Sequence, residues 1–140
     1  MGVRLVIRNP EQVSEMCGVL SMLLFLSANA YYPARLIANN FKPWSRETTH
    51  FFKKYLDVHM LLNLLGLFTL TLHGHYAPAD ERNIILSGAF VLTVWLVFAG
   101  ILMRYNVFHS MKKQMRLIHT QQTLFFVWLV LIILGHLIDA

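Results

Sequence analysis

Residues Leu56–His75 read LDVHMLLNLLGLFTLTLHGH, and these twenty residues are long and apolar enough to span a bilayer as one helix. The segment carries His59 near its start and His73 near its end, with Gly66 midway between them. Fourteen residues at about 100° each bring His73 to within roughly 40° of His59, at an axial separation of about 21 Å. The spacing therefore places both histidines and the glycine on one stripe of a predicted membrane-spanning helix.

This stripe is suited to binding two flat cofactors. A histidine lies near each predicted membrane surface, and Gly66 leaves the surface between them free of a side chain. Neutral imidazole is a common axial ligand of haem iron, so the pattern favours haem b. The alternative for this one helix is a pair of interfacial histidines with a glycine that serves helix packing alone.

The composition is typical of an integral membrane protein. Hydrophobic residues make up 56% of the 140-residue chain, and charged residues make up only 14%. We therefore expect a single domain, residues 1–140, that folds as an all-α membrane four-helix bundle. The predicted spans are residues 16–32, 56–75, 84–103 and 118–138. The chain has a single cysteine, Cys17, which argues against disulfides and cysteine-ligated metal sites.

The connections between the predicted spans differ in charge. Residues 33–54 and 104–116 together hold nine Lys and Arg residues, whereas the two ends of the chain and the short turn after His75 together hold three. The positive-inside rule then predicts a multi-pass protein of the inner (plasma) membrane, with both basic connections in the cytoplasm and both termini on the non-cytoplasmic side. We expect residues 33–54 to lie partly in the interface and residues 104–116 to form a basic loop. The net charge of +5 follows no nucleic-acid pattern, so membrane lipid is an expected partner and nucleic acid is not.

The last predicted span, residues 118–138, also carries a histidine near each end, at His119 and His136. One span separates it from the helix of His59 and His73, so the two helices run in the same direction. His59 should therefore share the cytoplasmic depth with His119, and His73 should share the outer depth with His136. Ionisable residues inside a membrane are costly and usually functional, so two pairs at matching depths favour cofactor ligands over structural histidines.

The second pair is spaced less regularly than the first. Its seventeen residues correspond to about 25 Å of rise and a difference of about 100° in side-chain direction. A bulge or distortion in the last helix, an oblique crossing, or a single genuine site would each account for the difference. The outer pair, His73 and His136, has the stronger case. His75 is the alternative to His73, but it points to the opposite side of the helix, and we expect it to be interfacial.

The spacing His59-x13-His73, with a second pair two spans later, resembles that of two-haem transmembrane b-type cytochromes. It is similar to the four-helix haem core of the ferric reductase and NADPH oxidase group, and to the cytochrome b superfamily more widely. The resemblance implies that His59, His73, His119 and His136 are bis-axial haem ligands, with Gly66 against the cofactors, and that electrons cross the membrane between two haems. The x16 spacing of the second pair is longer than the family's usual one, which leaves open whether the inner haem is present.

These patterns predict a non-catalytic electron-transfer subunit of a membrane oxidoreductase complex. Its one or two haems would carry electrons between a quinone or quinol pool and a partner redox subunit. Imidazole on both faces of the iron leaves no open position, so no residue is assigned a catalytic role. One alternative is a haem-poor quinone-binding anchor, and another is a structural subunit of a respiratory or photosynthetic complex. Asn63, one turn beyond His59, is expected to bond a neighbouring helix or to contact a quinone.

Overall fold

The computed structural model describes residues 9–30, 34, 37, 46–78, 83–105, 107, 110, 112–119 and 122–138. The helices with described bounds are α1 (Pro10–Asn29), α3 (Arg46–Tyr76), α4 (Ile84–Tyr105), α5 (Lys112–His119) and α6 (Gln122–Ile138). None of the described residues lies in a strand. The prediction of an all-α protein is therefore confirmed for this part of the chain.

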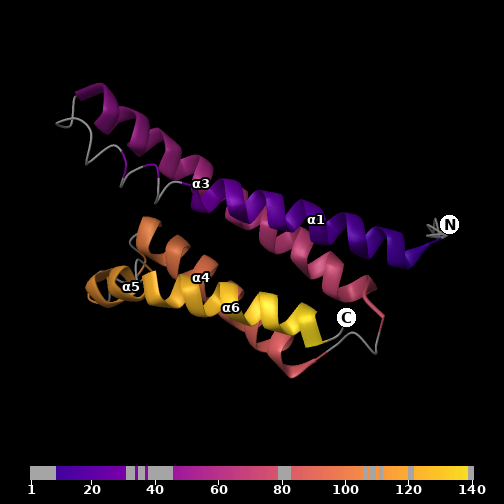
Figure 1. Ribbon diagram of the computed structural model, residues 1–140. Helices are drawn as coiled ribbons and strands as arrows, with labels where there is room; N and C mark the ends of the chain where they lie inside the picture. The colour runs from indigo at the N-terminus through magenta and orange to yellow at the C-terminus, as the bar shows by residue number, and fades with distance from the viewer. Residues whose placement is uncertain are drawn as a thin grey trace, which may run out of the picture.

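The long helices associate in two pairs. Figure 1 shows α1 lying along the C-terminal part of α3, and α6 lying along α4, while contacts between α3 and α4 join the two pairs. The start of α1 and the end of α6 lie at one end of the molecule, and α5 lies at the other. His59 lies near the middle of α3 and His73 lies in its last turn, so the two histidines are at different depths along the molecule.

Helices α1 and α3 are antiparallel and share one register over their contact. Ser14 of α1 bonds His73 of α3, and fourteen residues later Ala28 of α1 bonds His59 of α3. The glycine midway along α3, Gly66, lets the two helices approach closely, because the ring of Phe25 occupies the space that a Cβ would take. This pairing gives α1 contact with both histidines of α3.

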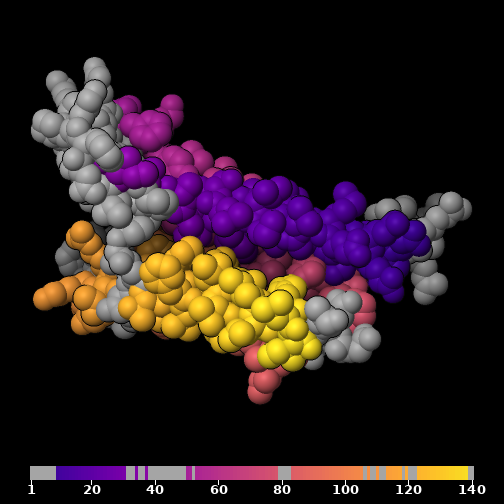
Figure 2. Space-filling model, in the orientation of Figure 1, coloured from indigo at the N-terminus to yellow at the C-terminus, as the bar shows by residue number. Residues whose placement is uncertain are grey.

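Among the described residues, two helices are long and apolar enough to cross a membrane, namely the part of α3 from Lys53 to Tyr76 and the whole of α4. The apolar part of α6, Thr123–Ile138, is shorter. Large apolar side chains on α4 and α6 are also exposed on the outside of the molecule. Figure 2 shows α6 forming much of one face. Exposure of this extent favours a membrane protein, because lipid tails would cover such a surface.

The bounds of two helices differ from those of the predicted membrane spans. The first helix starts at Pro10 rather than near residue 16, since proline is favoured at a first helical position and Glu11 suits the positive end of the helix dipole. Within the predicted span 118–138 the described residues belong to two helices, since α5 ends at His119 and α6 begins at Gln122.

The second half of the basic segment 104–116, which was expected to be a loop, belongs to α5. This short helix is amphipathic: Met115 is buried, while Lys113 and Arg116 are exposed. Helix α5 packs against α4, and the burial of one apolar side chain stabilises this otherwise polar segment as a helix.

The N-terminal residues 1–8 and His109 lie outside the described residues.

Candidate functional site

The structure brings the four predicted histidines together as two pairs, one beside the middle of α3 and one near its C-terminal end. The ring centres of His73 and His136 are 6.3 Å apart and their planes are nearly parallel, at 12°. The ring centres of His59 and His119 are 6.2 Å apart and their planes are nearly perpendicular, at 81°. Below, the first pair is called the outer pair and the second the inner pair.

Both distances match those of two imidazoles that bind one metal ion from opposite sides. With metal–nitrogen bonds of about 2.0 Å and ring centres roughly 1.1 Å behind each nitrogen, the two ring centres would lie about 6.2 Å apart. Rotation about the axis through the metal leaves this distance unchanged, so parallel and perpendicular rings fit equally well. The two pairs therefore have the separation that bis-imidazole ligation requires.

The histidine pairs suit a metal that brings its other ligands with it. The described residues contain no group of three or more His, Cys, Asp or Glu side chains that could hold a metal ion. Two imidazoles alone would leave a bare ion such as zinc without its usual four ligands. Porphyrin iron already has four nitrogen ligands and needs only the two axial ones, so the donor set fits haem.

Each of the four rings is oriented by a backbone carbonyl at its Nδ1 atom. The distances from Nδ1 to the carbonyl oxygen are 2.8 Å for His59 to Ala28, 2.9 Å for His73 to Ser14, 2.9 Å for His119 to Leu96 and 2.8 Å for His136 to Ile132. A carbonyl oxygen can only accept, so Nδ1 carries the proton and donates it. In a neutral ring the lone pair is then on Nε2. Metal-binding histidines usually have this arrangement, with the second nitrogen held by a carbonyl or carboxylate.

The carbonyls that orient the α3 histidines come from α1, which contains no histidine. Ala28 lies in the last turn of α1, where carbonyl oxygens have no partner within the helix. His59 donates to the oxygen of Ala28, and the hydroxyl of Tyr55 donates to the oxygen of its neighbour Ser27. Side chains of α3 therefore satisfy the C-terminal end of α1, which fixes the depth of α1 against α3.

Two glycines provide the space in which histidine rings lie. A Cβ at Gly18 would be 3.0 Å from Nδ1 of His73, and a Cβ at Gly100 would be 2.8 Å from Cε1 of His119. By contrast, a Cβ at Gly74 or Gly88 would meet nothing within 4 Å. Gly18 and Gly100 are thus positions where a larger residue would displace a ring.

Gly66, which lies midway between His59 and His73 on α3, faces α1. A Cβ there would lie 3.0 Å from the ring of Phe25. Phe25 makes an edge contact with Trp128 of α6, with ring centres 5.7 Å apart, and the indole of Trp128 donates to the hydroxyl of Thr93 on α4 at 2.7 Å. The four long helices each contribute one residue to this central layer, which lies between the inner and outer pairs along the molecule.

Asn63 and His75 lie near the pairs without forming part of them. The amide of Asn63 donates to the backbone oxygen of His59 at 2.8 Å and lies 3.2 Å from Nε2 of the same residue. These contacts are within α3, so the expected bond to a neighbouring helix is not the one that forms. His75 is exposed and its ring packs against Tyr76, with ring centres 4.9 Å apart, as expected for an interfacial residue.

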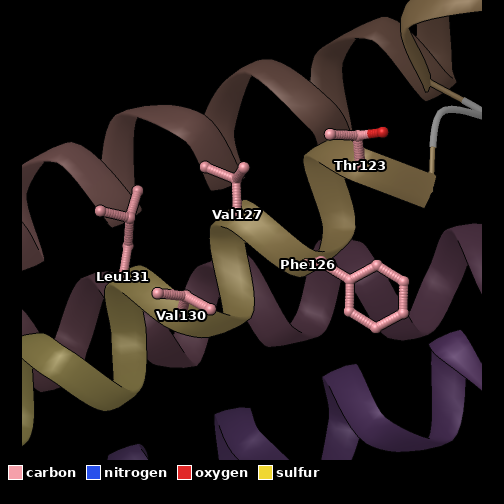
Figure 3. Close-up of a pocket in the computed structure, with 5 residues that line it drawn as sticks. All are labelled: Thr123, Phe126, Val127, Val130 and Leu131. Atoms are coloured by element: carbon pink, nitrogen blue, oxygen red, sulfur yellow. The ribbon is translucent and has the colours of Figure 1, made fainter.

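Two further features lie on the surface. Arg104 of α4 pairs with Asp57 of α3 at 2.5 Å, near the inner pair along both helices, and both side chains are about half exposed. Figure 3 shows five residues of α6 that line an open groove of about 500 Å³. They are Thr123, Phe126, Val127, Val130 and Leu131. The groove is an apolar helix face of the kind that lipid tails cover, and none of the four histidines lines it.

The sequence analysis did not identify the residues that orient the rings. Ala28 and Leu96 act through backbone oxygens, which leave no trace in a sequence. The sequence contains one indication that Ser14 and Ala28 face the two histidines of α3. Ser14 and Ala28 are fourteen residues apart, as are His59 and His73.

Comparison with known proteins finds no matching family model, no matching curated protein and no matching solved structure.

Proposed function

We propose that the chain is a membrane b-type cytochrome that holds one haem b between His73 and His136 and a second between His59 and His119. It would span the inner membrane four times, with both termini and the outer pair on the non-cytoplasmic side. Its role would be to carry electrons between a quinone or quinol pool and a partner redox subunit. A lipid-soluble quinone is a carrier that such a protein meets within the bilayer.

One observation carries the proposal. In both pairs, two rings whose Nδ1 protons are held by backbone carbonyls have their centres 6.2 and 6.3 Å apart. Structural histidines in a membrane need hydrogen-bond partners, but they have no reason to form two pairs at one separation. Four rings that are held at Nδ1 by carbonyl oxygens, and whose centres have a spacing suited to a metal, are better explained as ligands.

The protein's own residues would set the ligation, the burial and the separation of the two sites. Haem iron with an imidazole on each face carries single electrons and has no open position for substrate. The carbonyls of Ser14 and Ala28 hold the α3 rings, and the carbonyls of Leu96 and Ile132 hold their partners. The layer that contains Phe25 keeps the two sites apart.

The four-span arrangement draws support from the helix contacts. Helix α1 lies along the apolar part of α3 and bonds it near both ends, so it shares the same depth. Helix α6 is short for a span, but α5 continues the chain beyond its start and carries His119 to the level of His59.

The contact of Asn63 with His59 favours a second form of the proposal, in which only the outer pair binds haem. An amide within 3.2 Å of Nε2 occupies the position that iron would take at the inner pair. In this form the amide of Asn63 would be the group that contacts a quinone oxygen. Iron content distinguishes the two forms, since one haem per chain supports the second and two support the first.

The test is the visible spectrum and iron content of the protein purified from haem-replete cells. Dithionite-reduced protein should show the alpha band of a b-type haem. The haem should be extractable into acidic solvent, because a chain with one cysteine has no paired thiols for covalent attachment. A colourless, iron-free preparation would refute the proposal and leave the structural-subunit alternative.

A further inference from the structure

Ser14 makes more contacts with the outer pair than a helix-packing residue would need. Its side chain is buried, with 3% exposed, and its hydroxyl oxygen lies 3.0 Å from Nδ1 of His73. The hydroxyl also donates to the backbone oxygen of His73 at 3.0 Å, and the backbone oxygen of Ser14 lies 2.9 Å from the same Nδ1. One residue of α1 therefore holds both the ring and the backbone of His73.

The direction of each hydrogen bond follows from these partners. The single proton of the hydroxyl is given to the carbonyl of His73, so the lone pairs of the hydroxyl oxygen are available to the ring. The Nδ1 proton is then shared between two acceptors on Ser14, the hydroxyl oxygen and the carbonyl oxygen. A shared proton holds the ring plane in place and increases the electron density at Nε2.

Gly18 restricts the same ring from the next turn of α1. A Cβ at this position would lie 3.0 Å from Nδ1 and 3.1 Å from Cε1 of His73, so the ring rests directly on the helix backbone. Held between Ser14 and the surface at Gly18, the ring lies nearly parallel to that of His136.

We propose that the Ser14 hydroxyl is a positioning group of the outer site, which fixes the ring plane of His73 and strengthens it as an electron donor to iron. The inference rests on the proposed function, because it concerns haem held by the outer pair. A stronger donor favours the ferric state, so the hydroxyl lowers the reduction potential of the outer site. If both rings bind haem iron with their planes parallel, the iron orbitals that face the rings would differ in energy from the others. The ferric haem of the outer site would then give a rhombic low-spin EPR spectrum.

Two variants of equal size isolate the hydroxyl: Ser14→Val removes it and Ser14→Thr keeps it. A matched control is Ser21→Ala, because Ser21 is also a buried serine of α1 but its hydroxyl donates to Gly18 within the same helix. The outer signal is the spectral component that His136→Ala removes. The readouts are a redox titration and the low-temperature EPR spectrum of each haem component.

In Ser14→Val the outer component should become easier to reduce, with a ferric-to-ferrous ratio about threefold lower at a fixed potential, or roughly 30 mV. Its EPR signal should shift as the ring of His73 loses its fixed plane. Ser14→Thr and Ser21→Ala should match the wild-type protein, and the inner component should be unchanged in all three.

Three outcomes would overturn the inference. A wild-type potential and EPR signal in both Ser14→Val and the smaller Ser14→Ala would show that the hydroxyl has no role. Equal changes in Ser14→Thr and Ser14→Val would show that only packing matters. Absence of an outer haem from the wild-type protein would refute the proposed function as well, so the two failures are distinguishable.

Discussion

Replacing Gly100 with alanine should weaken haem binding at the inner pair and leave the outer pair unchanged. The new Cβ would lie 2.8 Å from Cε1 and 3.3 Å from Nε2 of His119. Carbon atoms pack at about 3.5–4.0 Å, so the ring must move by roughly 0.7 Å or more. It cannot move freely, because Nδ1 of His119 is bonded to the oxygen of Leu96 at 2.9 Å, one turn before Gly100 on the same helix.

The size of the effect follows from the cost of overpacking, which is about 1–3 kcal/mol. At 1.4 kcal/mol for each factor of ten, binding at the inner pair should weaken roughly 5- to 150-fold. The assay is titration of the haem-free protein with haemin in detergent, followed by the Soret absorbance of the two components.

Gly88→Ala is the matched control, because it lies in the same helix and a Cβ there meets nothing within 4 Å. It also controls for the gain in helix propensity, which favours alanine over glycine by about 1 kcal/mol. Gly18→Ala should give the mirror-image result and weaken the outer site alone. If Gly100→Ala binds haem as tightly as Gly88→Ala does at both sites, His119 is not a ligand in the position described.

Three further predictions test the rest of the site. His73→Ala and His136→Ala should each remove the same haem component, and the double variant should add little, because one site needs both ligands; unequal losses in a haem-content assay would contradict the pairing. Asn63→Ala should tighten haemin binding at the inner pair about fivefold, as expected for loss of a competing hydrogen bond of about 1 kcal/mol; weaker binding would mean that the amide supports the site. Reporter fusions should place Lys112 in the cytoplasm and Ala140 outside, and a cytoplasmic Ala140 would exchange the inner and outer assignments.

The pairing of the histidines could be predicted from the sequence because it depends on helix periodicity. Fourteen residues between His59 and His73 fix one stripe on α3, and a parallel helix two spans later must carry the partners. The difficulty with His119 had a simple cause. The argument from seventeen residues assumed one straight helix, whereas His119 ends α5 and His136 lies on α6. The angle of about 100° applies only to two residues of one helix, so it does not describe the directions of His119 and His136.

The orienting contacts could not be predicted from the sequence for a different reason. Ala28 and Leu96 contribute backbone oxygens, which every residue type has, so no side-chain pattern reveals them. The role of Gly66 depended on which neighbour lies against it, and helical phase alone cannot separate a cofactor from a phenylalanine such as Phe25. Such contacts require the relative depth of two helices, which only the folded structure gives.

The shared register of α1 and α3 has a consequence for how this protein can change in evolution. The contact at Ala28 depends on a backbone oxygen, so the identity of that residue is free to vary, but its distance along the chain from Ser14 is not. Inserting or deleting one residue between them would rotate the two oxygens relative to each other by about 100° and shift them by about 1.5 Å. One ring of α3 would then lose its acceptor. Relatives of this protein should therefore preserve the length of this segment more strictly than its sequence.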